Sequence, residues 1–118
     1  MSCNSNYVEY NFPKIRTNES FKGASFQVQI NGSPVDLSAG WSAKIEFRNG
    51  SPTGDVGLTL EDGDGITFDA DIANIEDIEV HPFTAADWYW DLVLTDPTGL
   101  RHTWTGGVQP VAQGTTST

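Results

Sequence analysis

Apolar and polar side chains alternate along much of this chain, and the clearest run covers residues 41–48. Eight consecutive positions there alternate between apolar and polar residues, which predicts a β-strand with one buried and one solvated face. The same pattern runs through residues 26–31 and ends at the turn-forming sequence Asn31-Gly32-Ser33-Pro34. A short extended piece at residues 35–37 is expected to follow.

Two hairpins are predicted where paired apolar stretches flank a turn sequence. Residues 56–60 and 66–68 flank the segment 61–65, whose glycines permit the positive φ values of a tight turn. Residues 88–95 and 100–105 flank a turn in which Pro97 presets φ and Gly99 can adopt the left-handed conformation. Both segments are therefore expected to reverse the chain between neighbouring antiparallel strands.

The remaining periodicity completes an all-β prediction. Residues 71–80 are spaced between helical and extended periods and are interpreted as mostly strand, while Val108 and Val111 suggest one last strand. About seven to nine short strands, with turn signals every 8–12 residues, predict an immunoglobulin-like antiparallel β-sandwich. Its core is expected to hold Phe26, Val28, Ile45, Phe47, Trp90, Leu92 and Leu94, with Tyr89, Asp91 and Val93 facing the other way.

The two ends of the chain differ from the middle. In the leader, residues 1–12, Val8, Tyr10 and Phe12 alternate with polar residues as though one face were to be buried. We expect this leader to be either an arm that contacts a neighbouring subunit or the first strand of its own sheet. Residues 13–112 are assigned to one sandwich domain and residues 113–118 to a polar tail.

The charge is unevenly distributed and bears on the partners. The formal net charge is −10, and residues 49–100 hold twelve of the acidic residues but no lysine or arginine. Such a field repels phosphate, so neither nucleic acid nor an anionic membrane is an expected partner. The acidity either keeps the protein soluble or complements a basic neighbour. No apolar run approaches membrane-spanning length and the N-terminus lacks a signal-peptide layout, so synthesis in a cytoplasm is expected.

Catalytic and metal-binding patterns are sparse. His81 precedes a proline and His102 alternates into a strand, so each is expected to be structural or exposed rather than catalytic. One cysteine, Cys3, and two separated histidines cannot supply a four-ligand zinc site. The acidic residues of segment 61–65 could attract calcium, but their spacing is too short for an EF-hand loop. No enzymatic activity, metal or cofactor is therefore expected.

Aromatic residues offer a different kind of site. Trp90 lies at strand spacing beside Leu92 and Leu94 and is assigned to the core, whereas Trp88 and Tyr89 at the strand entrance are candidates for exposure and sugar stacking. With the apolar face of the leader, they form the candidate interface. Its residues are Tyr7, Val8, Tyr10, Phe12, Trp88 and Tyr89.

Six motifs follow one another over residues 21–111. They are Phe21-Lys-Gly-Ala-Ser-Phe26, Gly32-Ser-Pro-Val-Asp-Leu37-Ser, Trp41-Ser-Ala-Lys-Ile-Glu-Phe-Arg48, Gly65-Ile-Thr-Phe68, Thr84-Ala-Ala-Asp-Trp-Tyr-Trp-Asp-Leu92 and Thr105-Gly-Gly-Val108. Their order resembles small structural domains of tailed bacteriophages, such as the N-terminal domains of upper baseplate proteins and related tail or head-fibre components. The leader and the Thr/Ser tail lie outside this pattern.

The resemblance implies a virion building block with an immunoglobulin-like fold, no enzymatic role and no cofactor. The expected location is the virion, in the tail or baseplate, at the neck or on the capsid. The expected partners are other virion proteins and copies of the same chain in a symmetric assembly. The alternative is a surface binding module, either a sandwich that recognises carbohydrate through Trp88 and Tyr89 or a domain stabilised by calcium.

Overall fold

The computed structural model describes residues 8–30 and 32–115, and they form strands, turns and loops without a helix. None of them, therefore, forms a helix long and apolar enough to cross a membrane. The strands in chain order are β1 (Val8–Glu9), β2 (Ile15–Arg16), β3 (Ala24–Gln27), β4 (Gln29–Ile30), β5 (Ser33–Pro34), β6 (Ser42–Asn49), β7 (Val56–Asp62), β8 (Gly65–Asp69), β9 (Ile72–Ile75), β10 (Ala86–Thr95) and β11 (Arg101–Ala112).

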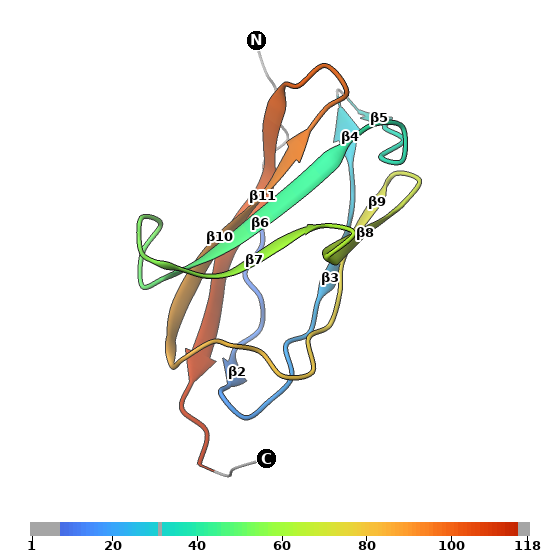
Figure 1. The fold of residues 1–118 in the computed structure, drawn as a ribbon. Helices are drawn as coiled ribbons and strands as arrows, with labels where there is room; N and C mark the ends of the chain where they lie inside the picture. The colour runs from blue at the N-terminus through green and yellow to red at the C-terminus, as the bar shows by residue number, and fades with distance from the viewer. Residues whose placement is uncertain (1–7, 31, 116–118) are drawn as a thin grey trace.

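Nine of these strands belong to one curled sheet in the order β1-β11-β10-β6-β7-β8-β9-β3, with β2 also paired to β11. The sheet folds over where β7 meets β8, so that β11, β10, β6 and β7 form one layer and β8, β9 and β3 the other (Figure 1). Within the layers, the orders β11-β10-β6-β7 and β3-β9-β8 are those of strands G-F-C-C′ and B-E-D of an immunoglobulin domain. The predicted all-β sandwich class is confirmed, although β1 and β2 pair in parallel with β11, and β7 pairs in parallel with β8.

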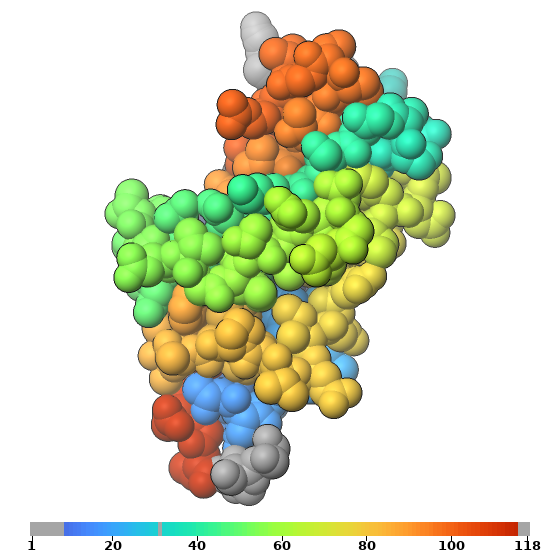
Figure 2. All heavy atoms as spheres, in the orientation of Figure 1, coloured from blue at the N-terminus to red at the C-terminus, as the bar shows by residue number. Residues whose placement is uncertain are grey.

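The core lies between the layers and follows the alternation of β6 and β10. These strands are antiparallel neighbours, and their register places Trp90 opposite Phe47 and Leu92 opposite Ile45. Cross-strand partners point to the same face of a sheet, so all four side chains are buried together. The predicted core is confirmed, with Phe26 half-buried against it. The molecule is elongated, with the β10–β11 turn at one end and the C-terminal end of β11 at the other (Figure 2).

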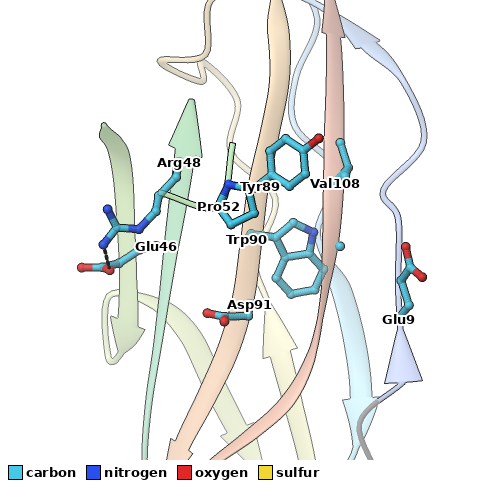
Figure 3. Close-up of a pocket in the computed structure, with 9 residues that line it drawn as sticks. Glu9, Glu46, Arg48, Pro52, Tyr89, Trp90, Asp91 and Val108 are labelled. Carbon is cyan, nitrogen blue, oxygen red and sulfur yellow. Dashed lines mark hydrogen bonds and ion pairs between the residues drawn. The ribbon is translucent and has the colours of Figure 1, made fainter. Parts of the chain in front are cut away.

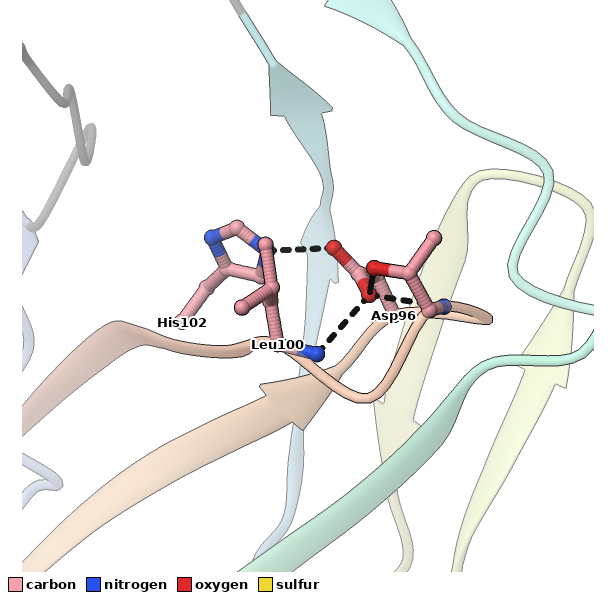
Figure 4. A network of polar contacts seen from close by, with 4 residues as sticks. Asp96, Leu100 and His102 are labelled. Atoms are coloured by element: carbon pink, nitrogen blue, oxygen red, sulfur yellow. Dashed lines mark hydrogen bonds and ion pairs between the residues drawn. The ribbon is translucent and has the colours of Figure 1, made fainter.

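The predicted hairpin of residues 88–95 and 100–105 is confirmed as β10 and β11. Asp96 closes its turn: one carboxylate oxygen accepts hydrogen bonds from the Thr98 amide and hydroxyl and the Leu100 amide, and the other lies 3.0 Å from His102 Nε2 (Figure 4). These bonds, led by the Thr98 hydroxyl, hold the pKa of Asp96 well below its usual value. The predicted last strand is a continuation of β11 beyond a bulge at Trp104.

The predicted hairpin of residues 56–60 and 66–68 is wrong. β7 and β8 pair only where Glu61 and Asp62 meet Gly65 and Ile66, and β8 then pairs along its length with β9 in the other layer. After a tight loop, in which the Glu61 and Asp64 backbones bond to each other in both directions at 2.9 and 2.8 Å, β8 pairs with β9 instead of β7. The segment therefore turns a corner between layers. Of residues 71–80, only Ile72–Ile75 form a strand.

The described part of the leader, residues 8–12, pairs with the chain's own sheet, which is the second of the two expected alternatives. β1 pairs with Thr105 and Gly106 of β11, and the Tyr10 amide donates to the Gly106 carbonyl at 2.8 Å. Phe12 is 2% exposed and packs its ring 4.9 Å from that of Trp90, so it is a core residue. The sandwich thus includes residues from Val8 onward, and Cys3, Tyr7 and residues 116–118 lie outside the described residues.

Candidate functional site

A shallow pocket lies on the solvent-facing side of the β1-β11-β10-β6 layer. Its volume is about 290 Å³. Residues from four strands and from the β6–β7 loop surround it (Figure 3). The lining residues are Glu9, Glu46, Arg48, Pro52, Tyr89, Trp90, Asp91, Gly107 and Val108.

Strand alternation produces this arrangement. Because Trp90 and Leu92 of β10 face the core, Tyr89 and Asp91 must face outward. On the neighbouring strand β6 the same rule turns Glu46 and Arg48 outward, and the register sets Asp91 opposite Glu46 and Tyr89 opposite Arg48. Four residues that lie far apart in the sequence are thereby brought together as two cross-strand pairs.

The guanidinium of Arg48 is already engaged. Its Nη2 lies 2.8 Å from Glu46 Oε1, and its Nη1 donates to the Gly54 carbonyl at 3.0 Å. The carboxylate of Asp91, in contrast, makes no hydrogen bond or ion pair with any described residue. Burial raises the pKa of the Asp91 carboxyl above its ordinary value, the nearby Glu46 carboxylate raises it further, and Arg48 partly offsets both. The pocket therefore holds a negative charge without a counter-ion of its own.

A second hollow continues from the first along the same face. It has a volume of about 400 Å³ and shares Glu46 and Asp91 with the first. Its other lining residues are Ser42, Ala43, Lys44, Glu61, Asp62, Val93, Thr95 and Arg101. Lys44 Nζ lies 3.7 Å from Glu46 Oε2, so this end of the face carries its own cations.

The carboxylates of the described residues do not converge on a metal. No group of three or more His, Cys, Asp or Glu side chains among them is close enough to hold a metal ion. In the acidic loop, Asp62 Oδ1 accepts a hydrogen bond from the Ala43 amide at 2.9 Å, which ties β7 to the start of β6. This carboxylate thus has a structural partner.

Trp88 was expected to be exposed, and the structure shows that it is buried at 5% exposure. Its Nε1 donates to the Thr84 carbonyl at 2.9 Å, and its ring packs against Phe83 at a centroid distance of 5.1 Å. The ring lies so close to Gly57 that a Cβ there would be 2.5 Å from it. Glycine on β7 therefore makes the room that buries Trp88 and removes it from any interface.

The other candidate interface residues fall in different places. Tyr89 is half-buried and lines the pocket. Tyr10 is half-buried with its ring edge-on to Phe12 and Phe26, at 5.1 and 5.3 Å. The backbone of Val8 pairs with Thr105. Only Tyr89 thus belongs to the pocket, while Tyr10 supports the core.

Both histidines take part in the framework. His81 is buried, its Nδ1 accepts from the Phe83 amide at 3.1 Å, and its Nε2 donates to the Arg16 carbonyl at 3.1 Å. His102 bonds Asp96, and its ring packs at a tilt against that of Trp41 with centroids 5.9 Å apart. These contacts give each imidazole a structural role.

Sequence reasoning had assigned Asp91 to the outward face but missed Glu46 and Arg48 as site residues. Their outward positions followed from the alternation of residues 41–48, whereas their proximity to Asp91 depended on the unknown register of two strands.

Comparison of the chain with protein-family models, with curated proteins and with solved structures found no match in any of the three.

Proposed function

We propose that this chain is a non-enzymatic structural component of a tailed-bacteriophage virion. It is made in the host cytoplasm and acts in the tail or baseplate, at the neck or on the capsid. It works through protein–protein contacts in a symmetric assembly, with other virion proteins and copies of itself as partners. Nucleic acid and membranes are not its partners, because its net charge of −10 repels both.

The sequence motifs behind this proposal form the framework of the sandwich. Phe21 and Leu37 are fully buried, the motif at residues 41–48 supplies β6, and the motif at residues 84–92 leads into β10. The motif Thr105-Gly-Gly-Val108 lies in β11, where β1 pairs with it. The motifs that carry the resemblance to phage domains thus lie in the strands and core of this chain. A fold does not determine a function, so the role of the chain depends on the surfaces that the fold leaves open.

The observation that carries the proposal is the presence of open strand edges. β3 pairs with β9 on one side, and residues 56–60 of β7 pair with β6 on one side; no strand of the described residues covers their other sides. Backbone amides and carbonyls on such edges can pair with a strand of another chain. A subunit held by neighbours through its edges needs no catalytic site.

The test is the composition of the particle. Purified virions of the phage that encodes this chain should contain it in a fixed stoichiometry by quantitative mass spectrometry, and labelled antibodies should mark one location by electron microscopy. Absence of the chain from particles that are otherwise complete would refute the proposal.

The alternative, a surface binding module for carbohydrate, loses Trp88 but keeps Tyr89 on the pocket wall. A glycan array probed with the isolated chain separates the two functions. Binding by a lone monomer that is lost in Tyr89→Ala and kept in Asp87→Asn would favour the module over the structural component.

A further inference from the structure

The pocket on the outer face has an unpaired carboxylate at Asp91, whereas Glu46 is paired with both Arg48 and Lys44. Glu9 from β1, Glu46 from β6 and Asp91 from β10 line it, and Arg48 is the one basic residue among the lining residues. Arg48 is held by Glu46 and by the Gly54 carbonyl, so it does not bond Asp91. The unpaired carboxylate of Asp91 therefore lies in the pocket opposite the Glu46 carboxylate of the neighbouring strand, where an added cation would be attracted.

The shape of the pocket favours an organic cation over a metal ion. The carboxylates are not grouped tightly enough to coordinate a metal. They surround a space of about 290 Å³ that is also lined by Tyr89, Pro52 and Val108. An aromatic ring and aliphatic walls suit the methylene stem of a long basic side chain, and a tyrosine ring also attracts a guanidinium.

We propose that this pocket receives an arginine side chain presented by a neighbouring protein. The planar guanidinium has five donors, so it can bond more than one of the separated carboxylates while it stacks on Tyr89. The chain itself has no lysine or arginine between Asn49 and Leu100, so its acidic surface complements a basic partner. The inference rests on the proposed function, because it states the chemistry of the partner at one of the contacts.

The first test uses the isolated full chain, labelled with ¹⁵N, and the capped peptide acetyl-Gly-Arg-Gly-amide as the probe. Saturable amide shifts are expected at residues 46–48, 89–91 and 107–108, and the same peptide with neutral citrulline should produce none. The variant Asp91→Asn should weaken binding by up to about fivefold, the upper end of the range for one solvent-accessible ion pair.

The matched control is Asp87→Asn, which changes the same charge on the same strand at an exposed residue outside the pocket. It should bind the peptide as the wild type does. Shifts that spread evenly over the acidic surface, or that weaken equally in both variants, would overturn the inference in favour of general charge attraction.

The second test separates this inference from the proposed function. Particles are assembled with wild-type chain in competition with Asp91→Asn, or with Asp87→Asn. Preferential exclusion of Asp91→Asn alone is the expected result. If the wild type is incorporated and Asp91→Asn competes equally, the pocket inference fails while the structural role stands. If the wild type is absent from particles, the proposed function fails, and the peptide titration still decides the pocket.

Discussion

Two buried tryptophans provide a direct test of the core, because they differ in one hydrogen bond. Trp88 is 5% exposed and its indole N–H donates to the Thr84 carbonyl. Trp90 is 4% exposed, between Phe12 and Phe47, and its buried indole N–H has no partner among the described residues. Replacing either by phenylalanine removes a similar amount of ring, so the difference between the two variants reports on the N–H group.

The expected difference follows from the two environments. Trp88→Phe loses a hydrogen bond with a net contribution of about 1 kcal/mol, while Trp90→Phe removes a buried unsatisfied donor that costs about 1–3 kcal/mol. Trp90→Phe should therefore be at least about 2 kcal/mol less destabilising than Trp88→Phe. Trp90→Ala, which removes the whole ring, should cost about 3–5 kcal/mol.

The assay is urea unfolding followed by far-UV circular dichroism, which avoids the fluorescence of the tryptophans themselves, with linear extrapolation to water. An equal dependence of the unfolding free energy on urea concentration in the three variants and the wild type would show that the comparison concerns the folded state. If Trp90→Phe proves as destabilising as Trp88→Phe, the indole N–H of Trp90 has a partner in solution and the reasoning is refuted.

Further predictions concern the edges, the pocket and the acidic loop. Gly107→Ala should detach the leader and lower the melting temperature by several degrees, because its Cβ would overlap the Tyr10 carbonyl oxygen; an unchanged melting curve would contradict the pairing of β1 with β11. Deleting residues 1–12 should leave a chain that does not fold, since Phe12 is in the core; a deletion that keeps its stability and loses only assembly would restore the arm hypothesis. Asp91→Asn should stabilise the fold at neutral pH, because ionised Asp91 is disfavoured in the folded state and the wild type loses stability as the pH rises through its raised pKa. Solvent screening limits this gain to a few tenths of a kcal/mol, about the scale of a surface charge interaction, and it should vanish below the ordinary Asp pKa of about 3.9. Millimolar calcium or a chelator should leave the melting temperature unchanged, and a rise of several degrees that is lost in Asp62→Asn would identify a calcium site.

Alternation predicted the faces of the long strands well. The buried positions of β6 and β10 repeat every second residue without a break, so their assignment needed no tertiary information. The same parity placed Trp88 in the core, together with Trp90. The expectation of exposure came from its place near the strand start. Trp88 is buried because Gly57, on a different strand, leaves room for its ring.

The corner between β7 and β8 shows where local signals run out. Gly63 and Gly65 do adopt positive φ, as expected for a tight turn, at 85° and 94°. Such a turn is compatible either with a hairpin in one layer or with a crossing to the other. The crossing goes with the pairing of β8 to β9 along Ile66–Asp69 in the other layer, a partner that the local turn sequence does not indicate.

The pocket was hidden from the sequence for a related reason. Outward-facing positions can be read from alternation, but the pairing of Asp91 with Glu46 depends on a register between strands about forty residues apart. A shift of that register by two residues would keep every core side chain buried and would place Lys44 opposite Asp91 instead. The carboxylate would then have a cation at its side, so the charge of the pocket is a property of register and not of composition.

The leader also shows that local sequence does not identify the pairing partner of a strand. Alternation of Val8, Tyr10 and Phe12 correctly signalled a strand with one buried face, but a buried face does not say which edge the strand will join. The edge it joins is β11, and Asn11 Oδ1 accepts from the Val108 amide across a separation of 97 residues. The local mark of that contact was the pair Gly106-Gly107, since a side chain at Gly107 would occupy the place of the Tyr10 carbonyl. Two consecutive glycines inside a long strand indicate a close approach of another backbone, and a leader with an apolar face and no strand of its own to pair with is the segment that can supply it.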